Sequence, residues 1–268
     1  TFAKVTPQQS GIWFANTIVE SDSFNVLKDF YAYNGGGVGV GDIDGDGFMD
    51  LFFTSTQEPE RLYRNNGDWT FTDVTERSGI TLEVGDITTG VLMTDITGDG
   101  WVDILIARRH LPSLIYVNDG SGHFNERSAE LGIVTTGQIT QFHVLDYDRD
   151  GDLDLFIVRN GEPRRQGYLN KGENDVLLRN EGNGRWVDVT EQAGIKDIGY
   201  GLSAAIGDLN DDGWPDIYVA NDFEERDNVW MNNKDGTFTD VATRAFQNMS
   251  WASMGSDIAD INNDGRLD

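Results

Sequence analysis

Five short windows of the chain place aspartates at a fixed spacing that suits a metal ion. Each window is nine residues long and follows the pattern D-x-[D/N/T]-x-D-G-x-x-D. Side chains at positions 1, 3 and 5 of such a loop can converge on one point, and glycine at position 6 permits the sharp turn. The windows are residues 42–50, 95–103, 146–154, 208–216 and 260–268.

We expect each window to offer oxygen ligands from side chains at positions 1, 3, 5 and 9 and from the backbone carbonyl at position 7. The glutamate that closes an EF-hand loop at position 12 is absent, and the aspartate at position 9 is placed to close the site instead. Hard oxygen ligands favour Ca²⁺ or Mg²⁺ over thiophilic metals, and five or more ligands in a flexible loop favour Ca²⁺. The sequence therefore predicts about one Ca²⁺ per window, up to five in the chain.

The alignment of the windows names the predicted ligands. Clustered carboxylates repel one another unless a cation neutralises them, so five recurrences favour metal loops over simple Asp-Gly turns. The window with neutral Thr97 at position 3 is the weakest. The side-chain ligands are Asp42, Asp44, Asp46, Asp50; Asp95, Thr97, Asp99, Asp103; Asp146, Asp148, Asp150, Asp154; Asp208, Asn210, Asp212, Asp216; and Asp260, Asn262, Asp264, Asp268, and the carbonyl ligands are Phe48, Trp101, Asp152, Trp214 and Arg266.

A second element recurs between the windows and completes a repeat of about 50 residues. In its first full copy, R-N-N-G at 64–67 is followed by F-T-D-V-T-E at 71–76 and G-I at 79–80. Short β-rich runs such as 38–40, 51–53 and 70–74 flank these motifs, and Asn-Gly is a hairpin turn signal. Four short strands per repeat are typical of one propeller blade. We therefore predict an all-β fold, a β-propeller of four-stranded blades with one calcium loop per blade.

The composition agrees with this interpretation. The chain has 268 residues, a formal net charge of −26 and 33 aspartates against 13 glutamates, and 19 of the aspartates lie in the five windows. Such acidity opposes binding to nucleic acid or anionic lipid, which Lys and Arg would attract. The absence of cysteine excludes disulfides and thiolate metal sites. The sequence contains no run of 18 apolar residues and therefore predicts no transmembrane helix.

These motifs, together with the Gly-rich segment 33–42, resemble the FG-GAP/VCBS repeat family, and more narrowly its cartilage-acidic-protein-like (ASPIC/UnbV-associated) branch. The resemblance implies an exported, seven-bladed propeller with a further C-terminal domain, used for scaffolding and adhesion more often than for catalysis. Four full windows and a fifth at the end of the chain represent four to five blades. Residues 1–268 are then one propeller domain, incomplete at its C-terminus.

No pattern in the sequence predicts a catalytic residue or an organic cofactor. His110, His123 and His143 lie in different repeats and form no metal-binding motif. We expect His143, in an apolar strand, to be a core residue, whereas His110 could face a central channel. The seven tryptophans mostly recur at blade positions, which predicts that they lie in the core.

The leading hypothesis is a calcium-stabilised binding or structural module in an extracellular, cell-surface or periplasmic setting, with a protein or glycan partner. One alternative is a polysaccharide lyase or hydrolase whose site lies in the central channel or in an insertion at 161–173. Another is an accessory subunit of a membrane-associated complex, docked through loops such as 108–109 or 164–165.

Overall fold

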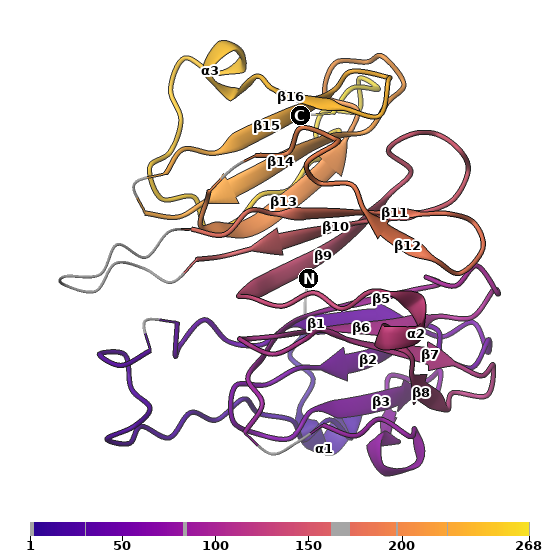
Figure 1. Cartoon of the computed structure of the whole chain (residues 1–268). Coiled ribbons are helices and arrows are strands. Elements are labelled where there is room, and N and C mark those ends of the chain that lie inside the picture. Colours follow the sequence, from indigo (N-terminus) through magenta and orange to yellow (C-terminus); the bar gives the residue numbers. More distant parts are fainter. Residues whose placement is uncertain are drawn as a thin grey trace. The chain divides into compact units, whose positions relative to one another are not determined.

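The computed structural model describes residues 3–29, 31–82, 85–161, 172–196, 198–223 and 225–267, and it shows an all-β chain (Figure 1). The insertion predicted at 161–173 lies almost entirely outside the described residues. The predicted ligand Asp268 and the predicted docking residues Arg164 and Arg165 also lie outside them.

Four four-stranded antiparallel sheets make up the described chain, and in each of them neighbouring strands follow one another in sequence. This arrangement confirms the predicted all-β class and the four-stranded blade. The strands are β1 (Val38–Gly41), β2 (Asp50–Phe53), β3 (Arg61–Asn65), β4 (Phe71–Asp73); β5 (Thr88–Thr94), β6 (Asp103–Arg108), β7 (Leu114–Asn118), β8 (Phe124–Glu126); β9 (Ile139–Leu145), β10 (Asp154–Arg159), β11 (Val176–Asn180), β12 (Trp186–Asp188); and β13 (Gly201–Gly207), β14 (Asp216–Asn221), β15 (Asn228–Asn232), β16 (Phe238–Asp240).

Helical segments in the described residues are single turns: α1 (Pro7–Ser10), the 3₁₀ turn η1 (Thr75–Arg77), α2 (Ser128–Leu131) and α3 (Ala242–Ala245). None of the helices in the part of the chain that the structure covers is long and apolar enough to cross a membrane.

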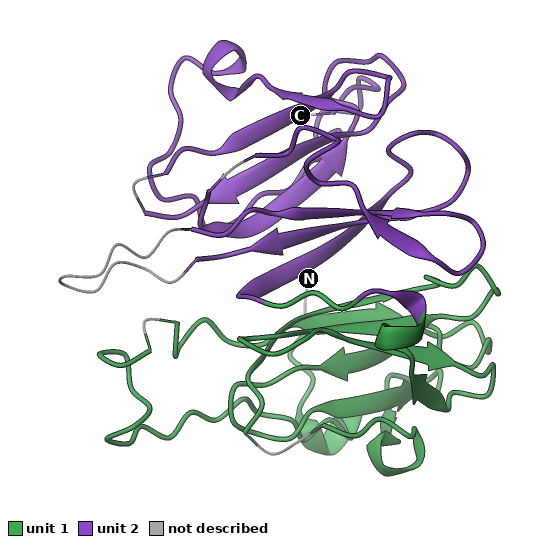
Figure 2. Cartoon of the chain, viewed as in Figure 1, with its two compact units in different colours: residues 1–130, 134–136 green, residues 131–133, 137–268 purple. Residues whose placement is uncertain are grey.

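The chain divides into two compact units, which Figure 2 colours separately. Unit 1 comprises residues 1–130 and 134–136 and contains sheets β1–β4 and β5–β8. Unit 2 comprises residues 131–133 and 137–268 and contains sheets β9–β12 and β13–β16. Each unit therefore holds a pair of blades and two full aspartate windows, and the fifth window ends unit 2.

Each of the four full windows connects the first strand of a blade to the second. In the register of β1 and β2, Gly41 pairs with Asp50, and Leu145 pairs with Asp154 in the corresponding hairpin of unit 2. The residue before position 1 thus faces position 9 across the ladder. A loop closed in this way brings the two ends of the window together before any ion is bound.

Apolar side chains between the two sheets of each unit form its core. In unit 1 Phe52, Ile104 and Phe124 are almost completely buried, and Phe156 and Ile217 are completely buried in unit 2. The glycines of β1 let β5 approach closely, since a Cβ atom on Gly39 would lie 2.8 Å from Met93 Cγ. The glycines before the first window therefore serve the packing of neighbouring blades.

The recurring G-I element joins neighbouring blades at their outer edges. The backbone N–H of Phe124, at the start of β8, donates to the carbonyl of Ser78 at 2.7 Å. In unit 2, Phe238 at the start of β16 donates to Ala193 at the same distance. In each unit the residue before a G-I pair thus accepts a backbone hydrogen bond from the last strand of the following blade.

The prediction that the tryptophans mostly belong to the core is only partly right. Trp186 and Trp230 are buried, but Trp13, Trp69 and Trp251 are 66%, 82% and 74% exposed. These three lie in turns and in terminal segments, outside the strands that form the cores. Their places in the repeat carried no information about burial.

Candidate metal centres

The aspartate at position 1 organises each window by accepting hydrogen bonds from the loop backbone. Asp42 Oδ1 accepts from the N–H of Gly45 and Oδ2 from that of Gly47, both at 2.8 Å. This pattern makes one carboxylate the hub of the turn. In the other windows Asp95, Asp146, Asp208 and Asp260 likewise accept from the N–H of Gly100, Gly151, Gly213 and Gly265.

The aspartate at position 9 is buried and ties the window to the third strand of its blade. Asp50 Oδ2 accepts from the N–H of Ile43 at 2.9 Å, and its Oδ1 accepts from the N–H of Asn65 at 2.7 Å. The same two bonds recur at Asp103, Asp154 and Asp216.

Burial is the main cause that raises the pKa of these position 9 carboxyls. It raises the pKa of Asp103 to about 6 and that of Asp154 to about 7. Neighbouring carboxylates add to the effect, because Asp148 and Asp150 repel the charge on Asp154. A nearby cation would remove this penalty.

Two windows bring three carboxylates together. One oxygen from each of Asp42, Asp44 and Asp50 lies within 4.8 Å of the others, and the same holds for Asp146, Asp148 and Asp154. Among the described residues, these are the groups of three or more acidic, His or Cys side chains that could hold a metal ion. Three of the four predicted side-chain ligands therefore converge in each of the two windows, at positions 1, 3 and 9.

The window 146–154 contains oxygen atoms that lack a protein partner. Asp146 Oδ1 and Asp148 Oδ1 are buried and accept no hydrogen bond. Burying a charged acceptor without a partner is costly. A cation between the carboxylates would satisfy both atoms, so the residues of this window fit a hard divalent ion.

The window 42–50 compensates its charge differently. Arg64 Nε lies 2.6 Å from Asp44 Oδ2, and Arg64 Nη2 lies 3.1 Å from Asp46 Oδ2. The equivalent residue in unit 2, Arg179, instead pairs with Glu181 at 2.6 Å. A protein cation thus already neutralises part of the first window.

The remaining windows do not gather three carboxylates within the described residues, and each has a local reason. In the second, the Thr97 hydroxyl at position 3 donates to Asp103 Oδ2 at 3.3 Å. In the fourth, position 3 is Asn210, whose amide lies against Met231, and Lys234 Nζ lies 3.2 Å from Asp212. In the fifth, position 9 is Asp268, outside the described residues. The carbonyl ligands predicted at position 7 stay predictions in all five windows.

One recurring residue type supports the windows and was missed by the sequence analysis. Asn118, at the end of β7, donates from Nδ2 to the carbonyl of Ile43 at 2.8 Å and to that of Val102 at 3.0 Å. Asn232 does the same in unit 2, toward Tyr147 at 2.8 Å and Pro215 at 3.2 Å. Each asparagine links the windows of two consecutive blades. These asparagines align with the first asparagine of the R-N-N-G motif, which the sequence analysis interpreted only as a turn signal.

His143, His110 and the arginine pair 108–109 differ in their contacts and exposure. His143 is half-buried and not part of the fully buried core; burial lowers its pKa to about 4, and its Nε2 lies 3.0 Å from Gln141 Oε1. His110 is exposed. Arg108 pairs with Asp86 at 2.7 Å, and the buried Arg109 binds Asp29. The guanidiniums of 108–109 therefore hold their own unit together, which leaves them poorly placed for the docking role considered above.

Comparison with protein families finds the FG-GAP-like repeat at residues 42–106, 95–157, 168–219 and 208–268. Similar curated proteins include cartilage acidic protein 1 of Homo sapiens, 26% identical over 192 residues, and that of Xenopus tropicalis, 26% identical over 196 residues. These alignments cover 70% of this chain but only 28% and 29% of the relatives. Both parts of the resemblance seen in the sequence are thereby confirmed.

Two solved structures show a weaker likeness. One is an Agrocybe aegerita lectin that recognises non-reducing terminal N-acetylglucosamine, with a TM-score of 0.42 and 21% identity over 75% of this chain and 49% of that one. The other is the V. cholerae biofilm matrix protein Bap1, with a TM-score of 0.42 and 16% identity over 75% of this chain and 27% of that one.

The matched repeats span most of the chain, and those that start at residues 42, 95 and 208 begin at position 1 of an aspartate window. The chain therefore belongs to the FG-GAP-like repeat family.

Proposed function

We propose that this chain is a calcium-binding part of an FG-GAP repeat propeller that serves as a binding or structural module. The observation that carries the proposal is the pair of buried, unpartnered oxygens Asp146 Oδ1 and Asp148 Oδ1 within a group of three carboxylates. Oxygen-only ligands in a loop of this length favour Ca²⁺ over Mg²⁺, which demands a stricter octahedron.

Calcium would act here mainly on stability. Each window joins two strands of a blade, so an ion that binds the folded window adds its binding free energy to that of folding. We propose about one Ca²⁺ per window, with the strongest sites at 146–154 and 42–50. Five ions would reduce the formal charge from −26 to −16.

The setting and the partner complete the proposal. Weak loop sites of this kind are filled where calcium is plentiful, which favours an extracellular, cell-surface or periplasmic location. A protein or a glycan is the partner we propose, without catalysis of a reaction. The whole protein would carry one propeller, of seven blades, to which residues 1–268 contribute.

Thermal unfolding with and without calcium tests the proposal. We expect the Tm to fall strongly when a chelator removes Ca²⁺, and to recover on addition of Ca²⁺ but not of an equal concentration of Mg²⁺. Isothermal titration should give more than one Ca²⁺ per chain. A Tm unchanged by chelation, together with no heat of calcium binding, would reject the calcium role.

A matched pair of variants locates the effect. Asp154→Asn removes a carboxylate from the window with unpartnered oxygens, whereas Asp188→Asn alters an aspartate of the same unit that lies at the end of β12, away from the windows. Only Asp154→Asn should reduce the number of ions bound. An equal loss in both variants would indicate general destabilisation instead of a calcium site.

A further inference from the structure

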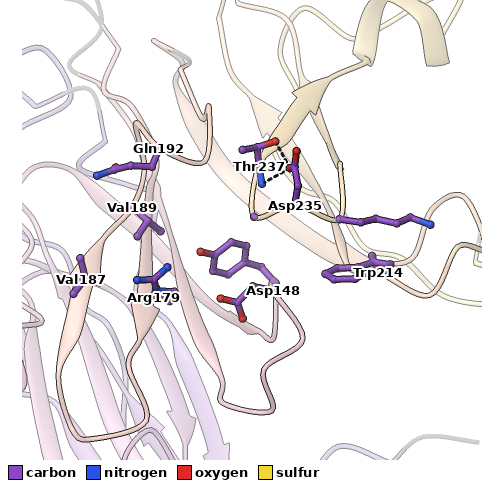
Figure 3. A pocket seen from close by; sticks show the side chains of 11 residues that line it. Asp148, Arg179, Val187, Val189, Gln192, Trp214, Asp235 and Thr237 are labelled. Atoms are coloured by element: carbon purple, nitrogen blue, oxygen red, sulfur yellow. Dashed lines mark hydrogen bonds between the residues drawn. The ribbon is translucent and has the colours of Figure 1, made fainter.

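A cavity of about 490 Å³ lies within unit 2 and is lined by strands and loops of both of its sheets. Its volume is in the range of small-molecule sites. Figure 3 shows Arg179 and Gln192 on one side and Trp214 and Asp235 on the other, with Asp148 between them. The wall thus mixes an aromatic surface with side chains that donate and accept hydrogen bonds.

Tyr147 lines this cavity at a position where the repeat otherwise has an aliphatic residue. At position 2 the other windows carry Ile43, Ile96, Leu209 and Ile261. The Tyr147 ring stacks on Phe238 with centroids 6.1 Å apart, and Tyr147 is 2% exposed and belongs to the core of unit 2. Because the other windows fill this position with an aliphatic residue, blade packing does not require a tyrosine here, and its hydroxyl is a polar group on a residue that lines the cavity.

Lys234 is a second departure from the repeat in the wall of the same cavity. The residue two places after the recurrent asparagine is Gly67, Gly120 or Gly182 in the other blades, and each has a positive φ. Lys234 holds a φ of 65° at this place. A left-handed backbone is unfavourable for lysine, and such strain concentrates at functional sites.

The charge balance of the wall selects the chemical class of the ligand. Arg179 and Lys234 offset Asp148 and Asp235, so the lining residues have no net formal charge. An anion would also meet the window 146–154, whose five aspartates and one arginine leave a formal charge of −2 even with one Ca²⁺ bound, and a cation would meet the two basic side chains. A neutral molecule with several hydroxyl groups can both donate to and accept from this wall, and its C–H groups can pack on Trp214.

We propose that this cavity binds a neutral saccharide ring, with Trp214 as a packing surface and Tyr147, Arg179, Gln192 and Lys234 as hydrogen-bonding residues. The inference rests on the proposed role of the chain as a binding module and names the ligand class and the site. Lys234 Nζ pairs with Asp212 and Arg179 with Glu181, so both basic groups are held in place near the cavity.

The test uses glucose, galactose, mannose and N-acetylglucosamine as probes of the calcium-loaded chain. Saturation-transfer NMR on the sugar and tryptophan fluorescence should detect millimolar binding of at least one of them. Tyr147→Ile, which restores the residue type of the other repeats, should weaken that binding about tenfold. Glucuronic acid should bind more weakly than the best neutral sugar.

Two variants separate binding from folding. Lys234→Gly should weaken binding about fivefold while leaving Tm unchanged or higher, because it relieves the strained backbone. Gly120→Lys, at the same turn of unit 1, should leave sugar binding unchanged. The proposal is overturned if no neutral sugar binds, if only glucuronic acid binds, or if Tyr147→Ile and Lys234→Gly both bind as the wild type does. A chelator effect on Tm that persists in any of these cases would keep the calcium proposal and reject only the saccharide site.

Discussion

The windows 42–50 and 146–154 share one loop geometry but balance their charge in different ways. Each gathers three carboxylate oxygens within 4.8 Å. In the first, Arg64 contacts Asp44 and Asp46, whereas in the second the buried oxygens of Asp146 and Asp148 have no partner. The same repeat can thus be partly neutralised by its own arginine or left dependent on an added cation. We expect this difference to control how each unit responds to calcium.

Removal of calcium should produce the largest effect, and it should be unequal between the units. Among the described residues no salt bridge reaches the carboxylates of 146–154, whereas Arg64 pairs with Asp44 and Asp46, so chelation should expose β9 and β10 to hydrogen exchange well before β1 and β2. Exchange mass spectrometry of the intact chain with and without chelator measures this difference. Equal loss of protection in the two hairpins would show that Arg64 does not substitute for the ion.

Acid should destabilise unit 2 through His143, and this effect must be separated from that of calcium. The folded pKa of about 4 lies below the ordinary 6.5, so only the unfolded chain takes up a proton between these values. The contribution of His143 to the free energy of unfolding should be constant above pH 6.5 and fall by about 1.4 kcal/mol per pH unit from there to about 4. The raised pKa values of Asp103 and Asp154 act in the opposite direction over part of this range, so the slope is read from the difference in free energy of unfolding between the wild type and His143→Gln, measured in urea with calcium present. His123→Gln, at an exposed side chain, should retain it.

The asparagines that link consecutive windows should matter more than those that serve a single window. Asn232→Ala leaves the carbonyls of Tyr147 and Pro215 without their donor, and we expect a loss of about 2–3 kcal/mol. Within the described part of the chain, the Asn180 amide donates to the carbonyl of Leu153 alone, at 3.3 Å, so Asn180→Ala should cost about 1 kcal/mol. Chemical unfolding compares the two, and similar losses would contradict a linking role.

The sequence could predict the blades and the windows because both depend on local patterns. An aspartate at position 1 reaches only the N–H groups of its own turn, so spacing alone locates Asp42 and its counterparts. The strand runs beside each window were likewise short and apolar. These features are set by residues within ten positions of one another.

The contacts that distinguish one window from another join residues far apart in the chain. Asn232 and Tyr147 are separated by 85 positions, and Arg64 reaches Asp44 across 20. The R-N-N-G motif alone does not predict whether its arginine pairs with the carboxylates of the window, as Arg64 does, or with a nearby glutamate, as Arg179 does with Glu181. Only the arrangement of strands decides this, because it fixes which side chains share a face.

When calcium is absent, removing one ligand carboxylate should change the stability in opposite directions in the two windows. Asp148→Asn removes a repelling carboxylate with an unpartnered oxygen, so it should raise stability by about 1 kcal/mol. Asp44→Asn removes the partner of Arg64 and should lower stability by about 0.5 kcal/mol. Tm measured in chelator tests both, and in calcium both variants should be less stable than the wild type. If both variants shift the Tm in the same direction in chelator, the two windows do not balance their charge in different ways.

The smallest expected effect is on calcium affinity, and it addresses the arginine directly. Arg64 and a bound Ca²⁺ compete for the carboxylates of Asp44 and Asp46. Arg64→Gln should therefore raise the Ca²⁺ affinity of 42–50 about threefold to fivefold. Arg179→Gln should change the affinity of 146–154 less, because Arg179 already pairs with Glu181. Titration of each variant at low and high salt measures the difference, which should shrink as salt screens the exposed arginine. If Arg64→Gln weakens calcium binding instead, the arginine positions the ligands of the first window and does not compete with the ion for their charge.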